Sequence, residues 1–145
     1  MSSPQTNPIL QGALVDLIDL TLLAKQAHWN VHGSHFRSVH LELDEVEAQL
    51  RDAQDLVAER LAAVGGNPDG RASTVLATSS VDDIGAGPLA ADKVVILFAD
   101  RLNGVARRLE AELGELDADL PSQDILIGTI QELDKAAWMF RAQES

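Results

Sequence analysis

Hydrophobic residues recur every three or four positions along four long stretches of the chain. This spacing places them on one face of an α-helix, so each stretch predicts a helix with one buried side. The predicted helices cover residues 9–31, 36–64, 88–116 and 122–143. Because no stretch shows the alternation of apolar and polar residues that marks a half-buried strand, we expect an all-α fold.

Residues that favour helix ends mark the predicted boundaries. Gly33 lies where the first helix should end, and Gly65 with Pro68 should end the second. Pro88 suits the first turn of the third helix, and Ser122 is the expected N-cap of the fourth.

The segment between the second and third helices is long and rich in Gly, Ser, Thr and Asp. It covers residues 67–87, and residues 72–77 could form a short helix within it. Four helices with one long crossover between the second and the third describe a ferritin-like four-helix bundle. The length of 145 residues suits one domain, so we expect a single domain over residues 1–145.

The composition narrows the class of protein. Hydrophobic residues make up 46% of the chain, which excludes a disordered protein. Asp16 and Asp19 interrupt the most apolar stretch, and we therefore expect no membrane span. The first residues carry no signal-peptide pattern. The absence of cysteine excludes disulfides, thiolate zinc sites and iron–sulfur clusters, and favours a cytoplasmic location.

The chain is strongly acidic, with 11 Lys and Arg against 23 Asp and Glu and a formal net charge of −12. Charge of this sign repels nucleic acid and anionic membranes and attracts cations. Taken alone, however, an acidic balance indicates nothing more specific than solubility.

Candidate metal ligands lie at helical spacing in the first two predicted helices. They are His28, His40, Asp44, Asp55 and Glu59. His40 and Asp44 are four residues apart and share a helix face, as do Asp55 and Glu59. Imidazole combined with carboxylates suits non-haem iron or another transition metal. The alternative is a solvated helix face whose carboxylates pair with nearby arginines.

The distance between the two pairs on the second helix has a consequence for assembly. Asp44 and Asp55 are eleven residues apart, which is about three turns and roughly 16 Å along a helix. Metal–ligand bonds are only about 2 Å long, so one metal cannot use both pairs from one helix. Two antiparallel copies related by a two-fold axis would bring the first pair of one subunit to the second pair of the other.

The segments that carry these residues resemble the Dps family, the mini-ferritins that form hollow dodecamers. The resemblance rests on HWNV-x-G-x-x-F-x-x-x-H-x-x-x-D at residues 28–44, D-x-x-x-E-R at 55–60 and D-K-x-x-W-M-F at 134–140. It implies a di-iron ferroxidase site with His28, His40 and Asp44 from one subunit and Asp55 and Glu59 from its two-fold mate. The chain lacks the Glu-x-x-His pattern on two helices that larger ferritins use.

The same resemblance implies an activity. Two Fe²⁺ ions would be bound and oxidised, preferentially by hydrogen peroxide rather than O₂, and ferric mineral would be stored in the cavity. It also places Trp29 near the iron site, where the alternative role is an interface aromatic. Lys25, one turn earlier, could support the site through a salt bridge or could simply be a surface lysine.

The resemblance further implies an acidic three-fold pore as an iron route, for which Asp124 lies in register. Asp119 and Glu115 are weaker candidates for the same pore. The alternative for Asp124 is a favourable interaction with the helix dipole. His32 and His35 lie outside the ferroxidase set; accessory metal binding is an option, but surface histidines are the simpler interpretation.

The chain departs from many family members in its terminal charge. It has no Lys or Arg before Lys25 and only Arg141 after Trp138, so we expect no tight DNA binding. The alternative function, a nucleoid-binding protein that protects DNA, would need a basic patch elsewhere. The arginines that could form it are Arg51, Arg71, Arg107 and Arg108. A third option is a helical oligomer or metal buffer without catalysis. Residues 73–87 match no sharp family pattern.

Overall fold

The structure is a computed structural model that describes residues 5–143. The outermost parts of both termini, where we expected no basic arm, lie outside the described residues. The elements are α1 (Thr6–Asn30), β1 (Val31–His32), α2 (Phe36–Ala63), α3 (Ala72–Thr78), β2 (Leu89–Ala90), α4 (Ala91–Glu112), a 3₁₀ turn (Leu113–Leu116) and α5 (Leu120–Arg141).

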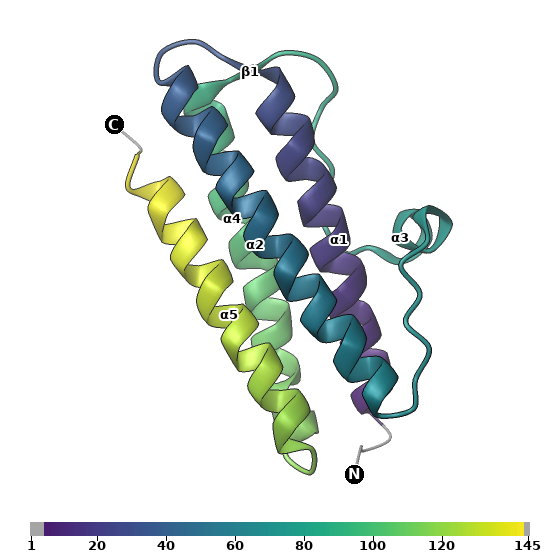
Figure 1. The fold of residues 1–145 in the computed structure, drawn as a ribbon. Coiled ribbons are helices and arrows are strands. Elements are labelled where there is room, and N and C mark those ends of the chain that lie inside the picture. Colours follow the sequence, from purple (N-terminus) through teal and green to yellow (C-terminus); the bar gives the residue numbers. More distant parts are fainter. Residues whose placement is uncertain (1–4, 144–145) are drawn as a thin grey trace.

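Four long helices form an elongated bundle (Figure 1). α1 packs along α2 and α4 packs along α5, and these are the two most extensive contacts between elements. A long crossover joins α2 to α4 and carries the short helix α3, which lies outside the bundle against α1 (Figure 1). The predicted all-α bundle with a crossover after its second helix is therefore confirmed.

The apolar stripe of each helix faces the centre of the bundle. Leu10, Leu17 and Leu43 are completely buried, and the rings of Phe98 and Phe140 lie 5.8 Å apart between α4 and α5. Burying one such side chain contributes about 1.5–3 kcal/mol. The amphipathic pattern therefore accounts both for the helices and for their packing.

Two predicted helix starts are wrong. Pro88 does not begin α4, because Val31 and His32 pair in parallel with Leu89 and Ala90 and keep the chain extended up to Ala91. This short pairing also corrects the expectation of a fold without strands.

The second correction concerns α5, whose N-cap is Asp119 and not Ser122. The Asp119 carboxylate accepts a hydrogen bond from the backbone N–H of Ser122 at 3.3 Å, and Pro121 occupies the first turn. An aspartate three residues before a free N–H satisfies that donor as well as a serine would, so the helix begins two residues earlier than predicted.

Two carboxylates of α1 fasten the crossover to the bundle. Asp16 accepts hydrogen bonds from the backbone and hydroxyl of Ser80, and Asp19 accepts one from the Ser79 hydroxyl at 2.5 Å. Asp16 is itself buried. The two residues that interrupt the apolar pattern of α1 thus bind the polar segment that runs over it.

We expected no segment that could span a membrane, but α1 meets the length and hydropathy of such a segment. Among the described helices it alone is long and apolar enough, with a mean hydropathy of 1.3. However, 56% of its most apolar window is buried within the bundle. A core helix of a bundle needs the same apolar composition, and the packing of α1 shows that role.

Candidate metal centre

The hairpin between α1 and α2 brings His28 and His40 face to face. α1 ends at Asn30 and α2 begins at Phe36, so the last turn of one helix lies beside the first turn of the other. The two imidazole rings stack with centroids 3.8 Å apart and planes at 10°. The ring of Phe36 stacks on the outer side of His40 at 4.9 Å. His28 and His40, which are twelve residues apart in the sequence, are therefore in direct contact.

Each histidine is held by the backbone of the other. The Nδ1 of His28 lies 2.7 Å from the carbonyl oxygen of His40, and the Nδ1 of His40 lies 2.7 Å from that of His28. A carbonyl oxygen can only accept, so both Nδ1 atoms must donate a proton. In the neutral imidazole, each Nε2 then keeps a free lone pair, which is the arrangement of metal-binding histidines.

Asp44 completes the arrangement one turn further along α2. Its Oδ1 lies 4.0 Å from the Nε2 of His28. A transition metal bonds histidine nitrogen and carboxylate oxygen at about 2.0–2.2 Å each, so an ion between these two atoms would span that gap. His28, His40 and Asp44 are thus a candidate half-site, whose imidazole and carboxylate donors are of the kind that iron binds.

Lys25 is bonded to this half-site. Its Nζ lies 2.5 Å from Oδ1 of Asp44 and 3.8 Å from Oε2 of Glu47. The hydrogen bond from Lys25 is the main cause that lowers the pKa of Asp44; partial desolvation opposes it, and the charge of the ammonium group acts in the same direction as the hydrogen bond. The salt bridge predicted for Lys25 is present, with Asp44 as its partner, while its support of a metal stays a prediction.

The second pair of predicted ligands lies elsewhere in the subunit. Asp55 and Glu59 are exposed on the same unbroken helix as Asp44, roughly 16 Å along its axis at 1.5 Å per residue. Asp55 borders a surface hollow of about 320 Å³ with Leu14 and Arg51. Within residues 5–143, no three His, Cys, Asp or Glu side chains of one subunit are close enough to hold a metal together. One described subunit therefore does not bring the five predicted ligands together.

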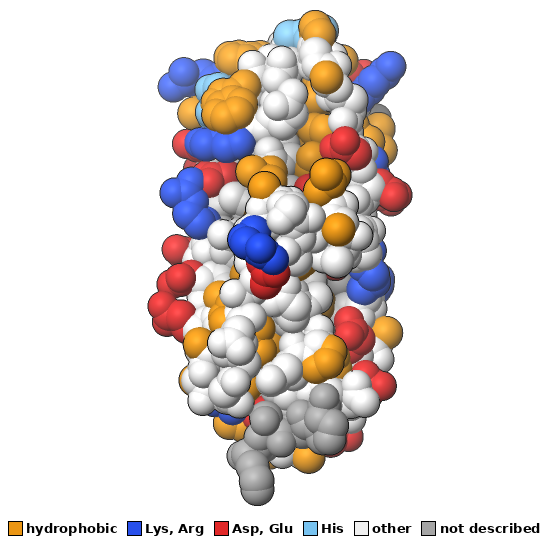
Figure 2. All heavy atoms as spheres, turned by 90° about the vertical axis from the view of Figure 1, so that its right-hand side faces the viewer, with side chains coloured by type: hydrophobic (Ala, Val, Ile, Leu, Met, Phe, Trp, Pro, Cys, Tyr) orange, Lys and Arg blue, Asp and Glu red, His pale blue; other side chains and the backbone are white. Residues whose placement is uncertain are grey.

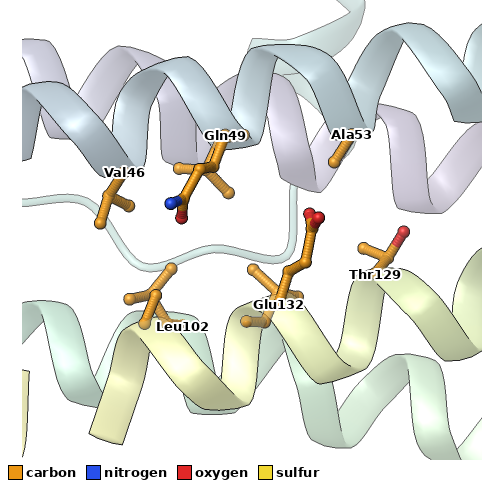
Figure 3. Close-up of a pocket in the computed structure, with 9 residues that line it drawn as sticks. Val46, Gln49, Ala53, Leu102, Thr129 and Glu132 are labelled. Atoms are coloured by element: carbon orange, nitrogen blue, oxygen red, sulfur yellow. The ribbon is translucent and has the colours of Figure 1, made fainter. Parts of the chain in front are cut away.

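The interior of the bundle offers no replacement. A groove between α2, α4 and α5 is lined by Val46, Ala53 and Leu102, while Gln49 and Glu132 reach into it from opposite sides (Figure 3). Its volume of about 10 Å³ is at the lower limit for a single water molecule. A di-metal site of the kind that larger ferritins build between their helices has no room there.

Several large apolar side chains are exposed around the half-site. Trp29, directly after the candidate ligand His28, is 69% exposed; Leu22, two turns earlier on α1, and Leu56, next to Asp55 on α2, are exposed further along the same two helices. Figure 2 shows the α1 and α3 face, where hydrophobic side chains are spread between charged ones that gather toward the two long edges. Isolated apolar residues on a surface are ordinary, but an exposed tryptophan beside candidate ligands favours contact with another protein chain.

Two of the three pore candidates, Asp124 and Asp119, differ sharply in exposure. Asp124 is exposed near the start of α5, as a pore residue must be. Asp119 is not available: its side chain is 1% exposed and bonded to Thr6, Ser122 and Arg60. Burial raises the pKa of Asp119, but its hydrogen bonds outweigh that effect and hold the pKa below its usual range. The expectation that Asp119 lines a pore does not fit its position in the subunit.

The two further histidines take no part in the half-site. His32 and His35 are exposed in the turn between α1 and α2, and His35 adopts the left-handed backbone conformation with φ of 67°. This geometry agrees with the simpler interpretation of surface histidines.

The four arginines that could form a basic patch are each bonded to a carboxylate. Arg71 binds Asp69 at 2.9 Å, Arg107 binds Asp134 at 2.6 Å and Arg108 binds Asp16 at 3.3 Å. Arg51 binds Glu47. A guanidinium group paired with a carboxylate contributes less net positive potential than a free one, which agrees with the expectation of weak DNA binding but does not test it.

Sequence reasoning missed Glu47. Its side chain is only 5% exposed, although glutamate is almost never buried without a partner. A signal was present, because Glu47 follows Leu43 by four residues and precedes Leu50 by three, and so falls on the apolar stripe of α2.

Comparison with known proteins agrees with this architecture. The ferritin-like domain family matches residues 8–144. The chain is 33% identical to a DNA protection during starvation protein of Agrobacterium fabrum, over 92% of this chain and 84% of that protein. It is also 33% identical to DNA protection during starvation protein 2 of Deinococcus radiodurans, but spans only 56% of that protein's length.

Solved structures give the same result. The crystal structure of Dps92 from Deinococcus radiodurans superposes with a TM-score of 0.92 at 32% identity, covering 95% of this chain and 84% of that one. Dps from Microbacterium arborescens in its high-iron form gives a TM-score of 0.89 at 31% identity, with 98% and 96% covered. In fold and in sequence, the chain therefore belongs to the Dps family of ferritin-like proteins.

Proposed function

We propose that this protein is a ferroxidase that oxidises Fe²⁺ and stores the ferric product in a cage. One observation carries the proposal: His28 Nε2 faces Asp44 Oδ1 at 4.0 Å, within the combined reach of two metal–ligand bonds of about 2.0–2.2 Å. Both histidines are fixed with Nε2 available. The two histidines are thus oriented before iron arrives, whereas Asp44 has to exchange its bond to Lys25 for the metal.

The missing ligands would come from a second subunit. If two copies of α2 run antiparallel about a two-fold axis, Asp55 and Glu59 of one copy reach His28, His40 and Asp44 of the other. The symmetry creates two identical sites at once. The exposed Trp29, Leu22 and Leu56 would be covered by the same contact, which supports this face as the dimer interface.

The chemistry of the complete site follows from its donors. Hard carboxylate oxygens stabilise Fe³⁺ more than Fe²⁺, so the site favours loss of an electron. Two Fe²⁺ ions each give one electron to one molecule of hydrogen peroxide, and with two protons this yields two Fe³⁺ and two water molecules. Iron is therefore the substrate, and peroxide and free Fe²⁺ are removed together.

The larger assembly belongs to the same proposal. Dps relatives suggest a dodecamer with an acidic cavity, in which ferric mineral would collect. Asp124, exposed near the N-terminus of α5, would attract Fe²⁺ at a three-fold pore, as carboxylate rings do in cation channels. A cytoplasmic location is part of this proposal.

Mixing subunits tests the shared site. Asp44→Ala removes a ligand from the first half-site, and Glu59→Ala removes one from the second, so each homo-oligomer should oxidise iron poorly. In a mixed dimer, one of the two sites keeps Asp44 from one subunit and Glu59 from the other. Anaerobic Fe²⁺ loading followed by peroxide should then show partial recovery of the ferric absorbance. Mixed dimers that form without any recovery would exclude the shared site.

A second candidate function is protection of DNA by direct binding. The names of the Agrobacterium and Deinococcus relatives refer to DNA protection. Against it stand the formal charge of −12 and the pairing of each candidate arginine with a carboxylate. Salt-dependent gel shifts separate this function from ferroxidase activity, because phosphate contacts weaken steeply with salt.

A further inference from the structure

Lys25 lies between two carboxylates of α2 that have different surroundings. Its Nζ is 2.5 Å from Oδ1 of Asp44 and 3.8 Å from Oε2 of Glu47. Asp44 is half exposed, whereas the side chain of Glu47 is buried. The ammonium group of Lys25 is thus bonded to Asp44, and a change of the lysine rotamer would bring it to Glu47.

The first position of Lys25 conflicts with iron binding. The oxygen that it contacts, Oδ1 of Asp44, is also the one that faces Nε2 of His28. A metal bonded to both atoms would lie within a few ångströms of the ammonium group, and the two positive charges would repel. Lys25 must therefore leave this oxygen when a metal occupies the half-site.

Glu47 is prepared to accept the ammonium group. Its Oε1 is bonded by Arg51, one turn further along α2, so the carboxylate is fixed in direction. Its other oxygen, Oε2, faces Lys25. A buried carboxylate gains more from a second cation than an exposed one does, because water screens it less.

The space for this movement is present. Lys25 and Glu47 both border a surface hollow of about 630 Å³ between α1 and the crossover, next to Trp29. Asp44 does not line this hollow. A lysine has four rotatable bonds, so Nζ can shift by a few ångströms toward Glu47 without moving the backbone.

We propose that Lys25 is a counter-ion with two positions, on Asp44 before metal binding and on Glu47 afterwards. The inference rests on the proposed metal site. Lys25 keeps its charge throughout, and Glu47 is a positioning residue that acts through Lys25 without touching the metal. In the metal-free state, Lys25 and Arg51 balance Asp44 and Glu47, so the half-site carries no net charge.

The arrangement has a consequence for selectivity. An incoming cation must displace the ammonium group of Lys25 from Asp44. A hydrated monovalent ion competes weakly for this carboxylate, whereas a divalent ion that also binds imidazole competes well. Without Glu47, the displaced ammonium would lose the carboxylate that already lies 3.8 Å away, and only Asp19 and Asp83 would remain as carboxylates bordering the hollow. Metal binding would then be weaker even though every metal ligand is intact.

Binding of Co²⁺ without oxidant tests the proposal through affinity rather than turnover. Glu47→Gln should lower the Co²⁺ affinity about tenfold, as loss of a residue behind the ligands commonly does. Lys25→Met should raise it, because the competitor for Asp44 is gone. In the Lys25→Met background, Glu47→Gln should change the Co²⁺ affinity by less than about twofold, because Glu47 acts on the metal only through Lys25. Glu45→Gln is the matched control, because it removes the same charge one residue from Asp44 at an exposed position.

Crystal structures of the wild-type protein, without metal and with Co²⁺, give a second readout that needs no variant. Nζ of Lys25 should lie nearer to Glu47 than to Asp44 when Co²⁺ is bound. If Lys25 stays on Asp44, or if Glu47→Gln weakens binding equally in the wild-type and Lys25→Met backgrounds, the two-position proposal is wrong while the metal site stands. If wild-type protein binds no Co²⁺ at His28 and Asp44, the metal site and this proposal both fail.

Discussion

Replacing Asp119 by alanine should destabilise the subunit strongly, although no metal ligand changes. The Asp119 side chain is 1% exposed and accepts hydrogen bonds from Thr6, from Ser122 and from the guanidinium of Arg60. It is also the N-cap of α5. One substitution therefore removes a helix cap and breaks an ion pair that joins the end of α2 to the start of α5.

The magnitude follows from these contacts. A lost N-cap costs about 1 kcal/mol by itself. Removing one partner of a buried ion pair costs about 3–5 kcal/mol, mainly because the remaining charge is unpaired. The Arg60 side chain is 22% exposed and can be hydrated, so we expect about 3 kcal/mol in all. For a chain of this size, that corresponds to a melting temperature lower by about 10 °C.

Thermal unfolding at one fixed protein concentration measures the effect, since assembly also stabilises the subunit. Asp117→Ala is the matched control: Asp117 is exposed, two residues away, and should cost no more than about 0.5 kcal/mol. Asp119→Asn should fall between the two, because asparagine can still cap the helix. Equal melting temperatures for Asp119→Ala and Asp117→Ala would refute the reasoning.

The pH dependence has a definite sign. Hydrogen bonds hold the pKa of Asp119 below its usual range in the folded protein. Its stabilisation is therefore complete above the unfolded pKa of about 3.9 and is lost as the pH falls through the lower folded pKa. The difference in stability between wild type and Asp119→Ala should be constant from neutral pH down to about 5 and should shrink in stronger acid.

Three further predictions concern function. His28→Ala should slow iron oxidation at least about tenfold and weaken Co²⁺ binding, measured by ferric absorbance and by calorimetry; unchanged affinity would remove His28 from the site. Asp124→Ala should slow iron uptake into the assembled cage but leave the melting temperature within about 2 °C of wild type, in contrast to Asp119→Ala. In metal-free buffer at roughly 0.15 M salt, gel electrophoresis of plasmid DNA should show no shift at sub-micromolar protein, and a salt-sensitive shift would favour the nucleoid function instead.

The pattern of the chain was sufficient for most of the fold. Helical periodicity located all four long helices and the short helix in the crossover, because burial of one helix face depends on local spacing alone. The same spacing placed Asp44 and Asp55 on one helix too far apart for one metal, and the unbroken α2 agrees with that. Glycines at positive φ, Gly33 and Gly65, mark the turns where two helices were expected to end.

Other features depended on contacts between distant segments, which spacing cannot encode. The extended start of α4 results from pairing with Val31 and His32, almost sixty residues earlier by the register of the two strands. The role of Asp119 depends on Arg60, which approaches it only after α2 and α5 have packed. A carboxylate near a helix start looks the same in sequence whether it lines a pore or is buried.

The candidate metal centre also combines features that the sequence predicts with features that depend on tertiary contacts. The sequence alone determined which imidazole and carboxylate side chains lie at the spacing of metal ligands, because residue type and helical spacing can both be read from the chain. Only the tertiary structure decided that His28 and His40 bind each other's backbone, which leaves both Nε2 atoms free for a metal. Likewise, only the packing of α1 on α2 placed Lys25 between Asp44 and Glu47. Spacing fixes which side chains share one helix face, whereas the distance across two helices exists only once their buried faces have met.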